Sequence, residues 1–101
     1  MASLTQLERL SGIPILASLQ EISRDFQAVI RVQQHSITGA IEKWVSAPKG
    51  VLSRIAPTWK NFFLVLRLIN QDQLALQMET FLEEHPSLGK TEGNGVAPHY
   101  I

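Results

Sequence analysis

The strongest constraint on the fold lies in residues 59–69, where apolar side chains cover almost the whole circumference of a predicted helix. Trp59, Phe62, Leu66 and Ile69 recur at helical spacing, and further apolar residues lie between them. A helix that is apolar on nearly all sides is normally central to a bundle. Only residues 70–72 separate it from the next apolar-periodic segment, so the two helices must pack as neighbours.

The same spacing of three and four residues predicts the other helices. We expect helices over residues 3–10, 14–33, about 37–46, 59–69 and 72–85, with one further turn over 51–55. A break of the 14–33 helix near Ser23 stays open. Residues suited to end or cap these helices stand at their boundaries: Gly12, Pro14, Ser36 or Thr38, Thr58, Asp72 and Pro86.

No segment alternates apolar and polar residues as a half-buried strand does. The predicted fold class is therefore all-α, a compact bundle of five or six antiparallel helices over residues 1–85. Residues 86–101 contain three glycines and two prolines. These residues interrupt regular structure, which predicts a flexible tail.

Composition narrows the class of protein. Hydrophobic residues make up 45% of the chain, enough for a core, and cysteine is absent, which excludes disulfides and thiolate metal sites. Nine basic residues balance nine acidic ones, whereas a general nucleic-acid binder carries a basic excess. The longest apolar run, 62–66, is too short to span a bilayer, and the first residues lack signal-peptide order. We expect a cytoplasmic protein.

Motifs that carry chemistry are not found. The histidines, His35, His85 and His99, have no partner at a metal-site spacing, so no metal or other cofactor is predicted. Gly89 and Lys90 lack the upstream glycines of a phosphate-binding loop. No nucleophile elbow or acid–base pair stands out. The sequence predicts a protein that is not an enzyme.

Charge is segregated along the chain although it cancels in total. Residues 1–35 are neutral, residues 36–70 carry a charge of +4, and residues 71–101 carry −4. Two interpretations explain this pattern equally well. The charges are ordinary surface charges, or the molecule has one basic and one acidic face. Opposite faces of that kind steer a molecule onto copies or relatives of itself.

Three segments, 37–44, 57–67 and 72–82, resemble the last three helices of a death domain. The first ends in Trp44, the second is led by Trp59, and the third contains Leu74 and Ala75. The resemblance implies a six-helix Greek key and a homotypic adaptor in apoptotic or innate-immune signalling. Residues 14–33 depart from the family pattern. They are predicted to form one long helix without a tryptophan, whereas the family has two helices and a tryptophan in this region.

The main functional hypothesis is a protein-interaction module that binds another death-fold domain or itself. Its predicted contact residues are Lys43, Lys49, Arg54, Lys60 and Arg67 on the basic side, and Asp72, Glu79, Glu83 and Glu84 on the acidic side. Two alternatives remain open. The apolar excess in 59–69 fits an obligate helical dimer or a structural subunit of a larger complex. A pocket lined by Trp44, Trp59 and Phe63 would instead make the chain a small-molecule carrier.

Overall fold

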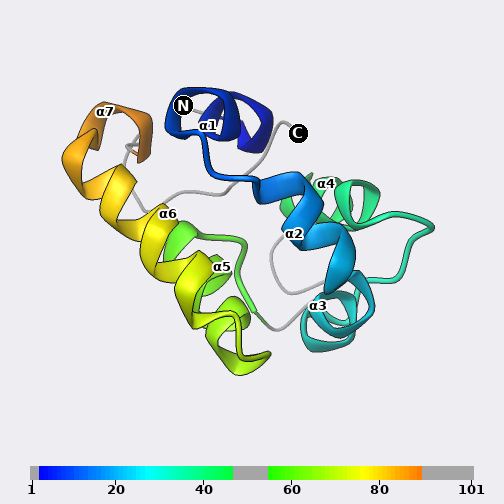
Figure 1. The fold of residues 1–101 in the computed structure, drawn as a ribbon. Coiled ribbons are helices and arrows are strands. Elements are labelled where there is room, and N and C mark those ends of the chain that lie inside the picture. Colours follow the sequence, from blue (N-terminus) through cyan, green and yellow to red (C-terminus); the bar gives the residue numbers. More distant parts are fainter. Residues whose placement is uncertain (1–2, 47–54, 90–101) are drawn as a thin grey trace.

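The computed structural model describes residues 3–46 and 55–89, and in these ranges every regular element is a helix (Figure 1). This confirms the all-α prediction. The described part holds seven helices rather than five or six: α1 (Leu4–Ser11), α2 (Ile15–Glu21), α3 (Ser23–Ile30), α4 (Ile37–Ser46), α5 (Trp59–Leu68), α6 (Asp72–Glu84) and α7 (Pro86–Gly89). The predicted turn over 51–55 lies outside the described residues except for its last position.

Aromatic rings hold the centre of the bundle together. Phe26 of α3 meets Trp44 of α4 edge to face at 6.1 Å between ring centroids, and Phe62 of α5 at 5.3 Å. Trp59 stacks on Phe63 at 5.8 Å. Such pairs add to the stabilisation that burial of their large apolar area provides. Trp44, Trp59 and Met78 are all buried in this core.

The predicted 14–33 helix is divided at Ile22, near the position where a break stayed open. Ile22 leaves the helical conformation with φ −111° and ψ 19°, and its N–H bonds to the carbonyl of Leu19. α2 and α3 therefore run in different directions (Figure 1). The change of direction lets Leu19 and Phe26, one on each side of the break, both reach the core with no exposed area.

α3 ends at Ile30, three residues earlier than predicted. Arg31 adopts the left-handed conformation with φ 59°, and Val32 then turns back into the core. A left-handed residue at this position is a common way to end a helix. The spacing of apolar residues extended the predicted helix to residue 33 because Val32 is apolar and in register. Spacing of this kind carries no information on where the chain reverses direction.

Three of the predicted caps are confirmed and one is wrong. The N–H groups of Gly39 and Asn61 bond to the hydroxyls of Ser36 and Thr58 at 3.1 Å, and Gly12 ends α1 in the left-handed conformation. Asp72 was predicted to cap α6. The cap position is instead Gln71, and Asp72 is the first helical residue. Its carboxylate stands in the first turn, where the helix dipole favours negative charge.

The connection between α5 and α6 is a tight reversal. Asn70 takes the left-handed conformation with φ 67°, its N–H bonds to the carbonyl of Arg67, and the N–H of Gln71 bonds to the carbonyl of Leu66 at 2.8 Å. This is a Schellman motif, in which asparagine replaces the usual glycine. The short connection makes α5 and α6 an antiparallel hairpin, as predicted.

Replacing Asn70 by alanine is expected to lower the free energy of unfolding by about 1 kcal/mol, because a β-carbon without a compensating polar group disfavours the left-handed conformation. Asn70→Gly should leave stability unchanged or raise it. Urea denaturation of the two variants measures the difference. Equal loss in both would show that the asparagine side chain, and not the backbone conformation, matters.

The beginning of the predicted tail is ordered. Residues 86–89 form α7, and Leu88 packs against the core from this short helix. α6 ends before Pro86, as predicted. The rest of the tail, 90–101, lies outside the described residues. None of the helices among the described residues combines the length and apolar character needed to cross a membrane.

Candidate functional site: the α5–α6 face

One side of α5 carries two cations and an exposed leucine. Lys60, Leu64 and Arg67 follow each other at intervals of four and three residues, which places them on one stripe of the helix. All three are exposed, and Leu64 keeps 48% of its surface accessible. The opposite side of α5 is buried because Phe62 and Leu66 pack into the core. The core contacts thus fix the direction in which this stripe points.

A matching stripe runs along α6. Asp72, Leu76, Glu79 and Glu83 follow at intervals of four, three and four residues. Leu76 is 52% exposed. The buried side of α6 carries Leu74, Ala75, Met78 and Leu82. The second stripe is therefore acidic where the first is basic, and each has one leucine in its middle.

An ion pair joins the two stripes into one surface. The Arg67 guanidinium donates to the Glu79 carboxylate at 2.6 Å, and both side chains are a little over one third exposed. We call the surface made by Lys60, Leu64 and Arg67 of α5 with Asp72, Leu76, Glu79 and Glu83 of α6 the α5–α6 face. A surface ion pair of this kind contributes at most about 1 kcal/mol to folding.

This pairing differs from the expectation of separate basic and acidic faces. Arg67 and Glu79 were assigned to opposite sides, and they are neighbours. Charges that are segregated along the chain therefore lie side by side in the fold: the basic stripe of α5 and the acidic stripe of α6 share a single face. The sequence did not show this because the contact joins residues twelve positions apart, across a connection whose geometry depends on Asn70.

The other predicted contact residues lie elsewhere. Lys43 is exposed on α4, which Figure 1 shows well apart from α6. Glu84 is exposed on α6, but it follows Glu83 directly and so points about 100° away from the stripe. Lys49 and Arg54 lie outside the described residues. The structure thus brings together five of the predicted residues: Lys60, Arg67, Asp72, Glu79 and Glu83.

Sequence reasoning missed the exposed leucines as site residues. Leu64 and Leu68 are among the further apolar residues of 59–69, and they are 48% and 60% exposed on α5. Leu76 follows Ala75 and resembles a core residue in sequence. A helical wheel centred on Leu74 and Met78 is the signal that identifies it, because it places Leu76 on the outer side.

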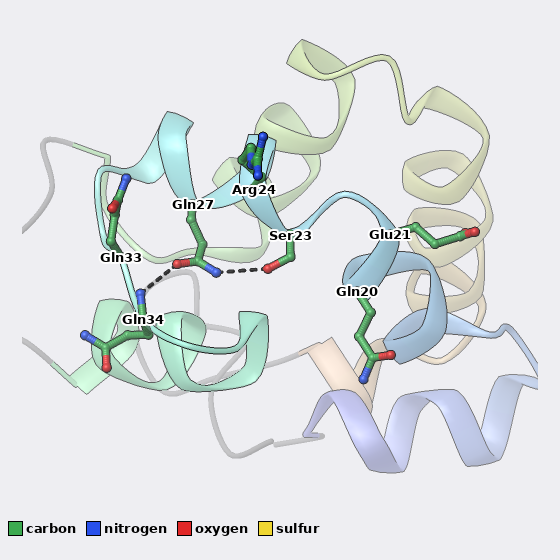
Figure 2. Close-up of a pocket in the computed structure, with 7 residues that line it drawn as sticks. All are labelled: Gln20, Glu21, Ser23, Arg24, Gln27, Gln33 and Gln34. Atoms are coloured by element: carbon green, nitrogen blue, oxygen red, sulfur yellow. Dashed lines mark hydrogen bonds between the residues drawn. The ribbon is translucent and has the colours of Figure 1, made fainter.

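A polar recess at the α2–α3 break is the second candidate (Figure 2). It is an open recess of about 600 Å³ and is lined by Gln20, Glu21, Ser23, Arg24, Gln27, Gln33 and Gln34. Gln27 is 8% exposed, donates to the Ser23 hydroxyl at 2.9 Å and accepts from the N–H of Gln34 at 2.7 Å. Figure 2 shows Gln20 and Glu21 pointing away from this chain of hydrogen bonds. The buried amide therefore serves to hold the 31–36 loop.

The rings considered for a ligand pocket are used in packing. Trp44, Trp59 and Phe63 are 2%, 7% and 5% exposed, and each contacts another core ring. The Trp44 indole N–H donates to the carbonyl of Ile55 at 2.7 Å, which ties the chain before α5 to α4. The Trp59 indole N–H is buried and has no hydrogen-bond partner among the residues that the structure describes.

In the described ranges, no three side chains of metal-ligating kinds lie close enough together to hold an ion. Comparison of the chain with protein-family models, with curated proteins and with solved structures gave no match in any of the three. The assignment of function therefore depends on the α5–α6 face itself.

Proposed function

We propose that this chain is a non-enzymatic protein-interaction module, a death-domain-like adaptor that binds a domain of its own kind through the α5–α6 face. The observation that carries the proposal is the composition of this face. Leu64 and Leu76 are about half exposed in the middle of two stripes of opposite charge. Leucines supply apolar area for association, and the charges orient the partner.

The helical architecture supports the comparison with death domains. α4 ends near a buried tryptophan, α5 begins with another, and a connection of three residues leads to α6. The division of 14–33 into α2 and α3 removes one departure from the family, which has two helices in that region. A six-helix Greek key with α7 as an addition, and a role in apoptotic or innate-immune signalling in the cytoplasm, complete the proposal.

Self-association that weakens as salt rises is the expected behaviour of the chain, because charged pairs steer the contact and salt screens them. Glu83→Lys should weaken self-association about tenfold, since it reverses a charge on the face. Sedimentation velocity over a concentration series at low and physiological salt measures both effects.

Glu84→Lys is the matched control. It changes net charge by the same amount at the adjacent residue, but it lies off the face. We expect it to self-associate as the original chain does. A chain that stays monomeric at all salt and protein concentrations would exclude the homotypic proposal, and equal weakening by the two substitutions would exclude this face.

The exposed leucines also support a second candidate, an obligate helical dimer. In such a dimer apolar contacts dominate, so dissociation does not increase with added salt. Leu76→Asp should then produce a monomer with a lowered thermal midpoint. In the adaptor, the same substitution removes self-association and leaves the thermal midpoint of the folded monomer nearly unchanged.

A further inference from the structure

We infer that the α5–α6 face binds a second copy of the same chain around a two-fold axis that runs parallel to α5 and α6, with the Arg67–Glu79 pair at its centre. This inference rests on the proposed function and specifies the geometry of the contact. It follows from the order of charges along the face, from the exposed leucines and from the antiparallel course of the two helices.

The ion pair marks the point where the two stripes meet. The charged ends of Arg67 and Glu79 are level because they touch. With a rise of about 1.5 Å per residue, Lys60 lies about 10 Å from Arg67 along α5, toward the start of that helix, and Glu83 lies about 6 Å from Glu79 along α6, in the same direction. Asp72 lies about 10 Å from Glu79 toward the start of α6, next to Gln71, whose N–H bonds to the carbonyl of Leu66 at the end of α5. The face thus carries an ion pair at its centre and further charges toward both ends.

Two closed arrangements can place this face against its own copy. An axis in the interface perpendicular to the helices lays α5 on α5 of the second copy and α6 on α6, which brings Arg67 against Arg67 and Glu79 against Glu79. An axis parallel to the helices lays α5 on α6 of the second copy and keeps the levels. Arg67 then meets Glu79 of the other copy, and the pair occurs twice because the contact is isologous.

Charge complementarity selects the parallel axis. In this arrangement the two Arg67–Glu79 pairs form a group of four alternating charges, and Lys60 of one copy lies at the same end of the face as Glu83 of the second copy. The perpendicular axis places like charges together at the centre, which costs free energy. Leu64 and Leu76 adjoin Arg67 and Glu79 on their stripes, so their exposed surface adds apolar area to the contact.

Reciprocal charge variants test the arrangement. Arg67→Glu gives two acidic groups at the centre and Glu79→Arg gives two basic groups, so each variant alone should remain monomeric at concentrations where the original chain self-associates. An equimolar mixture of the two should associate, because every contact across the centre then joins opposite charges. Sedimentation velocity with one variant carrying a fluorescent label measures the mixed species directly.

The controls use charges outside the face. Lys43→Glu and Glu42→Arg change net charge by the same amounts on α4, where both residues are exposed. Each should self-associate as the original chain does, and mixing them should bring no gain. Circular dichroism of all four variants verifies that they are folded, since an exposed ion pair contributes little to stability.

The outcomes separate this inference from the proposed function. Monomeric single variants and an associating mixture support the parallel two-fold contact. If the original chain self-associates and the two variants behave like it, or if the mixture of monomeric variants fails to associate, the arrangement is wrong although the homotypic function stands. If the original chain never self-associates, the proposed function and this inference are both overturned.

Discussion

Replacing Phe62 by alanine is expected to lower the free energy of unfolding by about 3–5 kcal/mol, the usual cost of truncating a buried phenylalanine. Phe62 has no exposed area, and its ring contacts those of Phe26, Trp59 and Phe63 at centroid distances of 5.3–6.1 Å. The substitution removes the ring contact between Phe62 of α5 and Phe26 of α3. Because the free energy of unfolding of a small domain is only about 5–15 kcal/mol, this substitution removes much of it.

Leu64→Ala is the matched control on the same helix. Leu64 is 48% exposed and faces away from the core, so its loss should change the free energy of unfolding by less than about 0.5 kcal/mol. Urea denaturation at low protein concentration compares the two without a contribution from self-association. Similar destabilisation in both variants would mean that α5 is not seated in the core as described.

The second large effect is expected for Gln27→Ala, which should lower the free energy of unfolding by about 1–3 kcal/mol. The side chain is 8% exposed and bridges the Ser23 hydroxyl and the N–H of Gln34 (Figure 2). Alanine leaves both groups without this partner, in a region where the chain has just reversed direction at Arg31. Amide exchange at Gln34 should become faster in the variant.

Gln20→Ala serves as its control, because Gln20 lines the same recess but is exposed. Its substitution should change the free energy of unfolding by less than about 0.5 kcal/mol and leave amide exchange at Gln34 unchanged. Unchanged exchange at Gln34 in Gln27→Ala would contradict the role assigned to the buried amide. The comparison of the two variants therefore shows whether the buried Gln27 stabilises the fold more than an exposed residue of the same recess does.

The proposed function and the stability predictions use different sides of the same helix. Phe62 and Leu66 direct α5 into the core, and the stripe of Lys60, Leu64 and Arg67 is exposed as a result. Substitutions on the stripe should therefore alter association with little effect on folding. Substitutions on the buried side should destabilise the folded monomer. They should reduce association only because less folded monomer is present.

Local rules predicted the helices and most of their ends because these depend on nearby residues. The hydroxyls of Ser36 and Thr58 cap the helices that follow them, and Gly12 ends α1, since each satisfies backbone groups within four residues. The rule failed at Asp72, one position past the true cap, because the Asn70 turn sets where α6 begins.

The break at Ile22 shows where local information is insufficient. The apolar spacing of 14–33 suits one straight helix as well as two, and nothing in those residues alone distinguishes them. In the fold, Leu19 of α2 and Phe26 of α3 are both buried with no exposed area, one on each side of the break. The energy of packing, which involves residues from other helices, decides that the chain bends there.

The sequence by itself determined that this protein is helical, where most of its core side chains lie and that its charge is divided between two segments, because periodicity and composition are properties of the chain alone. Only the tertiary structure decided that the basic and acidic residues of α5 and α6 share a face, with Arg67 on Glu79 and two leucines exposed beside them. The reason is that the hairpin at Asn70 brings residues twelve positions apart into contact, and no spacing rule specifies which stripes of two packed helices meet.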